Sequence, residues 1–160
     1  MSRMEIDYNN SKLESLISAS EYVNSHVWNV GILDDAPKGL AEIAYKNEFG
    51  ASGESSDLHH DIPERSFIRQ PLYDSWEGII EQYFKASGNT EWWYELGMNP
   101  NLFTAHIAYM CSTVIIAAIT DDYPQKKKNS PYTLARKQTT VALTDKGVLE
   151  ANIKYKESGI

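Results

Sequence analysis

Apolar positions recur with helical spacing in three stretches of the chain. Residues 12–23 place their aliphatic side chains on one face, behind a capping box formed by Ser11 and Glu14. Residues 71–86 carry apolar side chains three or four positions apart, and the stretch 100–120 is mostly apolar and has no formal charge. The pattern predicts a helix in each stretch.

Other segments alternate apolar and polar positions, which predicts strands. The turn residues Asp34–Gly39 would join two of these segments into a hairpin. A polar loop at about residues 50–62, followed by Pro63, would form an extended arm. The predicted fold is α+β, a single antiparallel β-sheet packed on two or three helices with an extended β-hairpin arm, in one domain spanning residues 1–160. The predicted strands are residues 4–8, 26–33, 40–49, 62–68 and 151–156.

Composition is that of a soluble globular protein, with 42% hydrophobic and 23% charged residues in 160. The single cysteine excludes an internal disulfide framework, and the N-terminus lacks the apolar region of a secretory signal. The stretch 100–120 is long enough to span a bilayer. Because Asn101, His106 and Ser112 interrupt it, a buried helix is favoured over a membrane span.

The net charge of −7 is unevenly distributed. Residues 1–120 contain 17 acidic and 7 basic side chains, whereas residues 121–160 contain 5 acidic and 8 basic ones. Simple DNA affinity is not expected, because phosphate binding requires a cationic surface. The opposed charges suit head-to-tail contacts between identical subunits, with ordinary surface variation as the alternative.

Candidate catalytic and metal-binding residues are weak. His59 and His60 lie in an acidic loop, but adjacent histidines in an extended chain point in opposite directions, which favours a solvated loop over a metal site. Cys111 lies in the most apolar stretch, where packing is expected rather than reactivity. The sequence contains no nucleophile motif and no phosphate-binding glycine loop, so neither an enzyme nor a cofactor is predicted.

Protein contacts are the favoured role for several residues. Arg65, Phe67 and Arg69 alternate on one face of the predicted strand 62–68 and its extension, and guanidinium groups beside an aromatic ring are good interface anchors. Tryptophans favour interfaces too, although filling the core is the alternative for Trp92 and Trp93, and a solvated surface is the alternative for the lysine cluster. The predicted interface residues are Glu48, Phe49, His59, His60, Ile62, Arg65, Phe67, Arg69, Trp92, Trp93, Lys126, Lys127 and Lys128.

Five segments, taken in order, resemble the virion-morphogenesis or tail-completion proteins of long-tailed bacteriophages, which include phage Mu G-like proteins and the lambda minor tail protein Z. The resemblance covers about residues 26–156. The chain departs from the family pattern at Lys146, where threonine is usual, and residues 89–99 are particular to it. The matching positions are Val30-Gly31, Ala44 with Glu48-Phe49-Gly50, Ile62-Pro63 with Arg65 and Phe67, Pro131 with Thr133 and Lys137, and Asp145 with Gly147.

The resemblance implies a structural virion protein that forms a ring, expected to be a hexamer, between tail tube and head connector during head–tail joining. Its partners would be copies of itself, the tail tube or tail terminator protein, and the head–tail connector or neck protein. Genome DNA would pass through the lumen without specific binding, and no membrane would be involved. The subunit would be assembled in the host cytoplasm and reside in the tail or neck. A tail terminator of the same fold class and a non-viral soluble binding or regulatory module are the alternatives.

Overall fold

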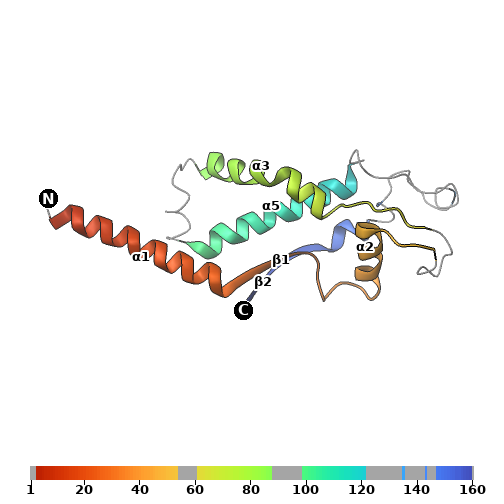
Figure 1. Ribbon diagram of the computed structural model, residues 1–160, viewed down its shortest axis with the longest axis horizontal. Coiled ribbons are helices and arrows are strands. Elements are labelled where there is room, and N and C mark those ends of the chain that lie inside the picture. Colours follow the sequence, from red (N-terminus) through yellow and green to blue (C-terminus); the bar gives the residue numbers. More distant parts are fainter. Residues whose placement is uncertain are drawn as a thin grey trace. The chain divides into compact units, whose positions relative to one another are not determined.

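The computed structural model describes residues 3–53, 61–87, 99–121, 135, 143 and 147–159. Within these ranges the chain has four α-helices and a two-stranded antiparallel sheet, a small α+β fold as predicted (Figure 1). Their order is α1 (Arg3–Ser25), β1 (His26–Ile32), α2 (Leu40–Phe49), α3 (Arg69–Ser87), α5 (Pro100–Thr120), a 3-10 turn at Glu150–Asn152, and β2 (Ile153–Gly159).

The chain divides into two compact units. The first comprises Met1–Asn29, Glu77–Met110 and Lys156–Ile160. The second comprises Val30–Trp76 and Cys111–Tyr155. The predicted helices at residues 12–23, 71–86 and 100–120 are confirmed as parts of α1, α3 and α5. The predicted capping box of Ser11 and Glu14 is wrong, because α1 begins at Arg3 and both residues lie inside it.

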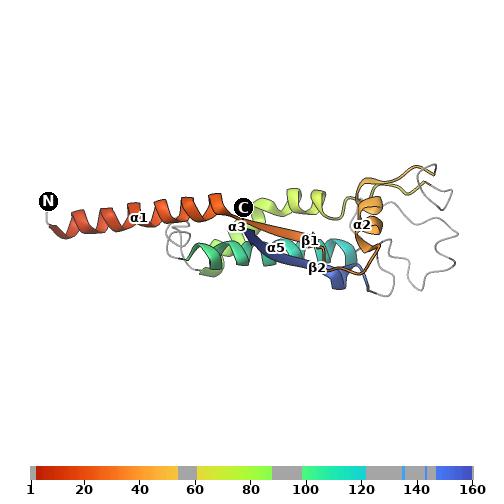
Figure 2. The same cartoon turned by 90° about the horizontal axis from the view of Figure 1, so that it is seen from below.

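The sheet pairs the strand after α1 with the last strand of the chain. β1 and β2 lie side by side in both views (Figure 1, Figure 2). The side-chain amide of Asn29 donates a hydrogen bond from Nδ2 to the Ser158 hydroxyl across the pair, at 2.9 Å. The strands predicted at residues 26–33 and 151–156 are therefore confirmed in type. The hairpin between residues 26–33 and 40–49 is wrong, because β1 pairs with β2.

Residues 40–49 form a helix, not the predicted strand. Leu40, Ala44 and Glu48 are buried, and their spacing of four places them on one helical face. Ile43 and Tyr45, on other sides of the helix, are both exposed. Alanine, leucine and glutamate favour helix, so the local composition agrees with the structure and the apparent period of two was misleading.

Two other predicted strands are also absent. Residues 4–8 belong to α1, whose helix begins at Arg3. Residues 62–68 form no strand, and their one β-bridge joins Ile62 to Ala51. A two-stranded arm is therefore not formed by the described residues.

The core of the second unit is built mainly from α2, α5 and the segments that end at Phe67 and begin at Ile153. The side chains of Phe67, Ile115 and Ile119 are almost completely removed from solvent. This packing anchors the C-terminal half of α5. The cluster contains Leu40, Ala44, Phe67, Ile115, Ile119, Leu143, Leu149 and Ile153.

By length and hydropathy alone, α5 could cross a membrane, and 33% of its most apolar window is buried inside the protein. Its buried residues include Cys111, as predicted, and burial raises the pKa of this thiol. A raised pKa lowers the thiolate fraction, so Cys111 packs as a small apolar side chain and is a poor nucleophile.

Replacing Ile115 with alanine is expected to lower the free energy of unfolding by about 2–5 kcal/mol, because the truncation leaves a cavity in a fully buried site. Urea denaturation followed by circular dichroism measures the loss. Leu102→Ala on the same helix is the control, since Leu102 is 62% exposed and its loss should be within about 0.5 kcal/mol. Equal losses in the two variants would contradict the burial described.

Candidate protein interface

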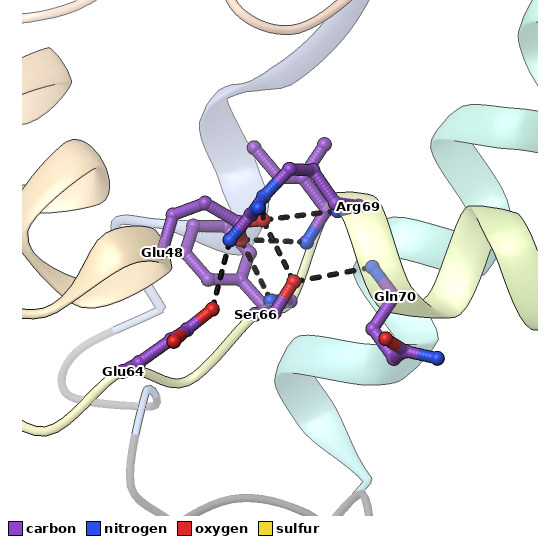
Figure 3. Close-up of polar contacts among 7 residues, drawn as sticks. Glu48, Glu64, Ser66, Arg69 and Gln70 are labelled. Atoms are coloured by element: carbon purple, nitrogen blue, oxygen red, sulfur yellow. Dashed lines mark hydrogen bonds and ion pairs between the residues drawn. The ribbon is translucent and has the colours of Figure 1, made fainter.

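The carboxylate of Glu48 is the most heavily hydrogen-bonded side chain of the site (Figure 3). The residue is 3% exposed. Its Oε2 accepts hydrogen bonds from the backbone amides of Phe67 and Ile68, at 2.8 and 2.9 Å. Its Oε1 accepts from the Ser66 hydroxyl at 2.9 Å, and from the backbone amide and Nε of Arg69, both at 3.0 Å. One side chain of α2 thus fixes four consecutive residues of the segment that opens α3.

These contacts also cap the N-terminus of α3, where backbone amides lack partners within the helix. The Arg69 amide donates to Glu48, and the Gln70 amide donates to the Ser66 hydroxyl at 3.1 Å. Pro71, at the next position, has no N–H to satisfy. A negative charge is also favoured at the positive end of the helix dipole. The start of α3 therefore depends on a side chain supplied by α2.

Burial of the Glu48 carboxylate opposes its ionisation and is the largest single influence on its pKa. The amides of Arg69 and Ile68, the Ser66 hydroxyl and the Arg69 side chain all favour the ionised form. Together they outweigh the burial, so the pKa of Glu48 lies below its ordinary value. Glu48 is therefore ionised at neutral pH, as its contacts require.

Arg65 and Phe67 are buried, so the predicted exposed edge of Arg65, Phe67 and Arg69 is wrong. Arg65 donates from its backbone amide to the Asn47 carbonyl and from Nη1 to the Asn47 side chain, at 2.8 and 2.7 Å. Burial lowers the pKa of its guanidinium. The prediction that Arg65, Phe67 and Arg69 share one face was wrong because residues 62–68 form no pleated strand. The side chain of Phe67 enters the core instead.

Arg69 is the exposed member of that group, and it stacks on an exposed aromatic ring. Its guanidinium carbon lies 4.3 Å from the centre of the Phe49 ring, a cation–π contact. Its Nη2 pairs with Glu64 at 2.9 Å while its Nε contacts Glu48 (Figure 3). Three neighbours thus hold the guanidinium in one orientation.

Tyr45 extends this surface along α2. Its ring lies 4.7 Å from that of Phe49, one helical turn away. Tyr45 is 63% exposed and Phe49 46% exposed. The α2 patch, defined as Tyr45, Phe49 and Arg69, combines two aromatic rings and a guanidinium, the residue types that most often dominate protein binding energy.

Gly50 ends α2 in a conformation that side chains rarely adopt, with φ of 76°. A Cβ at this position would lie 3.0 Å from both the Ile62 carbonyl oxygen and the Glu64 amide nitrogen. Both neighbours are backbone atoms and cannot swing away. Gly50 therefore lets the chain after the α2 patch approach residues 62–64 closely.

The predicted loop is closed at its base. Ala51 and Ile62 exchange two backbone hydrogen bonds, at 2.9 and 2.8 Å. The Gly53 amide donates to the Asp61 carboxylate at 2.7 Å. The backbone of Ile62 thus closes the base of the loop. The predicted role of its side chain at an interface stays a prediction.

Of the predicted interface residues, the structure brings Glu48, Phe49 and Arg69 together. Tyr45 was not among the predicted residues, although its spacing of four from Phe49 would have indicated it had residues 40–49 been assigned to a helix. Several predicted residues lie outside the described ranges: His59, His60, Trp92, Trp93, Lys126, Lys127 and Lys128.

Within the described ranges, no group of three or more histidine, cysteine, aspartate or glutamate side chains could hold a metal ion. The arrangement present is suited to binding a protein surface through stacked rings and a fixed positive charge. Comparison with family models, with curated proteins and with solved structures finds no match to this chain. The resemblance to phage tail-completion proteins stays a prediction from the sequence.

Glu48→Gln is expected to lower the free energy of unfolding at pH 7 by about 2–3 kcal/mol, because the NH2 group that replaces one oxygen cannot accept hydrogen bonds and the bonds to the remaining oxygen are no longer charge-assisted. A carboxylate with a lowered pKa in the folded state stabilises the protein above its unfolded pKa of about 4.3, and the benefit is lost as pH falls further. The difference between wild type and variant should therefore be constant from pH 7 to about 5 and shrink below that.

Urea denaturation at a series of pH values measures this difference. Glu42→Gln is the matched control on α2, since Glu42 is exposed and pairs with Lys46 one turn away. The control should leave stability nearly unchanged at neutral pH. If the free energy of unfolding of the wild type still exceeded that of Glu48→Gln by the same amount at pH 3, the charge of Glu48 would not be what stabilises the contact.

Gly50→Ala is expected to destabilise the fold by more than about 1 kcal/mol, because the new Cβ meets two backbone atoms at a positive φ. Gly78→Ala is the control with opposite sign. Gly78 lies inside α3 with open space around its Cβ position, so alanine should stabilise by up to about 1 kcal/mol. Thermal unfolding of both variants tests the contrast, and a neutral Gly50→Ala would refute the close approach.

Proposed function

We propose that this chain is a structural protein of a long-tailed bacteriophage virion, a tail-completion or neck subunit that acts by docking and carries out no chemistry. The observation that carries the proposal is the α2 patch, an exposed pair of aromatic rings beside a guanidinium held by Glu48, Glu64 and Phe49. The resemblance of the sequence motifs to tail-completion proteins supplies the biological setting.

Preorganisation supports a docking role for the α2 patch. Long side chains usually lose rotamer freedom when a partner binds, at a cost of about 0.5–1.5 kcal/mol each. Arg69 has already lost much of this freedom in the free protein, since its Nε and Nη2 contact two carboxylates and its guanidinium carbon lies over a ring. A partner therefore meets a surface whose shape is set before contact.

The residues shared with the tail-completion motifs also support the proposal, because their contacts build the α2 patch. Ala44 and Phe67 pack in the core beneath it. Glu48 joins α2 to the start of α3, and Gly50 turns the chain back toward residues 62–64. The motifs thus describe a scaffold that presents Phe49 to solvent, which fits a family of assembly proteins.

In this proposal the subunits form a ring, expected to be sixfold, at the head-proximal end of the tail. A closed ring needs two different complementary surfaces on each subunit. The α2 patch would be one of them. Residues 1–120 have an excess of acidic side chains, and residues 121–160 have an excess of basic ones. These opposite charges would favour contacts between unlike surfaces of neighbouring copies.

Phe49→Ala in a phage that encodes this chain is expected to block joining of heads to tails. Loss of a hot-spot side chain costs about 2 kcal/mol or more per contact, which is about thirtyfold in affinity, and a ring repeats that loss at every subunit. Plaque titre and negative-stain microscopy measure the effect. DNA-filled heads and free tails should accumulate.

Tyr73→Ala is the matched control, because Tyr73 is an aromatic side chain on α3 that is 82% exposed and lies outside the α2 patch. It should leave the titre unchanged, and both variants should show wild-type circular dichroism. A normal titre with Phe49→Ala would remove the α2 patch from the assembly surface. Absence of the chain from purified virions, measured by mass spectrometry, would overturn the proposed function itself.

A further inference from the structure

Helix α1 turns its less apolar side toward its own unit. Ala19 is buried, and Ser15 and Tyr22 on the same side are partly buried. The Tyr22 hydroxyl contacts the Glu157 carboxylate, and the Tyr22 ring stacks on His26 with centroids 4.2 Å apart. These contacts fix the rotation of α1 about its axis.

Over residues 13–23, the opposite side of α1 carries large aliphatic residues. We call Leu13, Leu16, Ile17 and Val23 the α1 stripe. Each is between 42% and 57% exposed, although an amphipathic helix normally buries such residues. Because Tyr22 holds the other side in place, the helix cannot rotate to bury the α1 stripe without losing its contacts with Glu157 and His26.

The spacing of the exposed residues is that of a helix–helix seam. Leu13, Leu16, Ser20 and Val23 follow one another at intervals of three, four and three, the a/d pattern of a coiled coil. All four are solvent-exposed in α1. Such a seam is complementary to a second helix with the same spacing, since knobs of one enter holes of the other. Polar Ser20 interrupts it and limits its strength.

The charge of α1 argues against a lipid surface as the partner. Helices that lie on membranes carry lysine and arginine along the polar face. The sequence of α1 contains four acidic and two basic residues, and exposed Glu14 and Glu21 flank the α1 stripe. Helix α1 lacks the basic polar face that holds such helices on anionic lipid, so a protein helix is the better match.

The area of the stripe fits a weak homotypic contact. Its four side chains expose roughly 400 Å² per chain, the size of patches that are often functional on soluble proteins. Two copies would bury about 800 Å² through these residues, below the 1,200 Å² or more of stable complexes. We therefore propose that a second copy of this chain covers the α1 stripe, α1 against α1, in a reversible dimer of the free protein.

Sedimentation velocity of the full chain tests this, across concentrations up to about 100 µM, where weak interfaces of this size become populated. The expected result is a concentration-dependent species of twice the 18.1 kDa chain mass. Leu13→Gln with Leu16→Gln should abolish it without unfolding, since both side chains are exposed. A wild-type chain that stays monomeric throughout would overturn the proposal.

A matched pair of gain-of-function variants tests the seam directly. Ser20→Leu completes the a/d pattern and should tighten the dimer at least about tenfold by burying a new aliphatic side chain. Ser18→Leu adds the same side chain to an exposed position outside the seam and should change nothing. Equal effects of the two would overturn the proposal, as would flotation of the wild type with anionic phosphatidylserine vesicles that depends on Leu13 and Leu16.

The proposed dimer and the proposed function can be tested independently of each other. Tyr73→Ala, on an exposed side chain outside both the α2 patch and the α1 stripe, should leave self-association of the free chain at wild-type strength. A dimer that is lost in Leu13→Gln with Leu16→Gln, together with failed virion assembly in Phe49→Ala, would support both proposals. A dimer that persists in Leu13→Gln with Leu16→Gln would overturn the assignment of the contact to α1, whatever Phe49→Ala does to virion assembly.

Discussion

The second unit depends on one ionised side chain. The Glu48 carboxylate accepts five hydrogen bonds from residues 66–69 and so ties α2 to the start of α3. Because the charge is buried, its desolvation must be offset locally, and amides at a helix N-terminus are suited to that task. The same contact completes the cap of α3 and steers the side chain of Arg69 toward Phe49. The same carboxylate thus stabilises the second unit and orients the exposed guanidinium of the α2 patch.

The same residue explains why sequence reasoning misread residues 40–49. A ten-residue helix has fewer than three turns, and one of its three core-facing positions is a glutamate, so the apolar stripe is too short to reveal a period of 3.6. Long stretches such as residues 100–120 were predictable because many apolar positions agree. Phe67 and Arg65 were misassigned for a related reason: their burial depends on Asn47 and the core cluster, tertiary neighbours that local alternation does not encode.

The candidate interface was partly predictable. Phe49 and Arg69 were both named from the sequence, but as members of two β-strands, whereas the structure joins them through a cation–π contact between α2 and the first residue of α3. The sequence could not predict the orientation of the Arg69 guanidinium. Whether a guanidinium is presented or buried depends on which carboxylates reach it, and those of Glu48 and Glu64 come from different segments. Tyr45 was missed because its neighbour at the next turn was placed on a strand.

The paired hydrogen bonds between Ala51 and Ile62 have a consequence for how such proteins diversify. The bridge and the Gly53–Asp61 contact join the two chain segments that flank residues 54–60. The fold of these flanking segments therefore does not depend on the length of the sequence between them. Lengthening a closed loop costs little, about 0.6 kcal/mol for each doubling. Insertions, deletions or grafted epitopes should therefore be accommodated between residues 53 and 61, which makes this position a natural place for related sequences to vary in length while the scaffold persists.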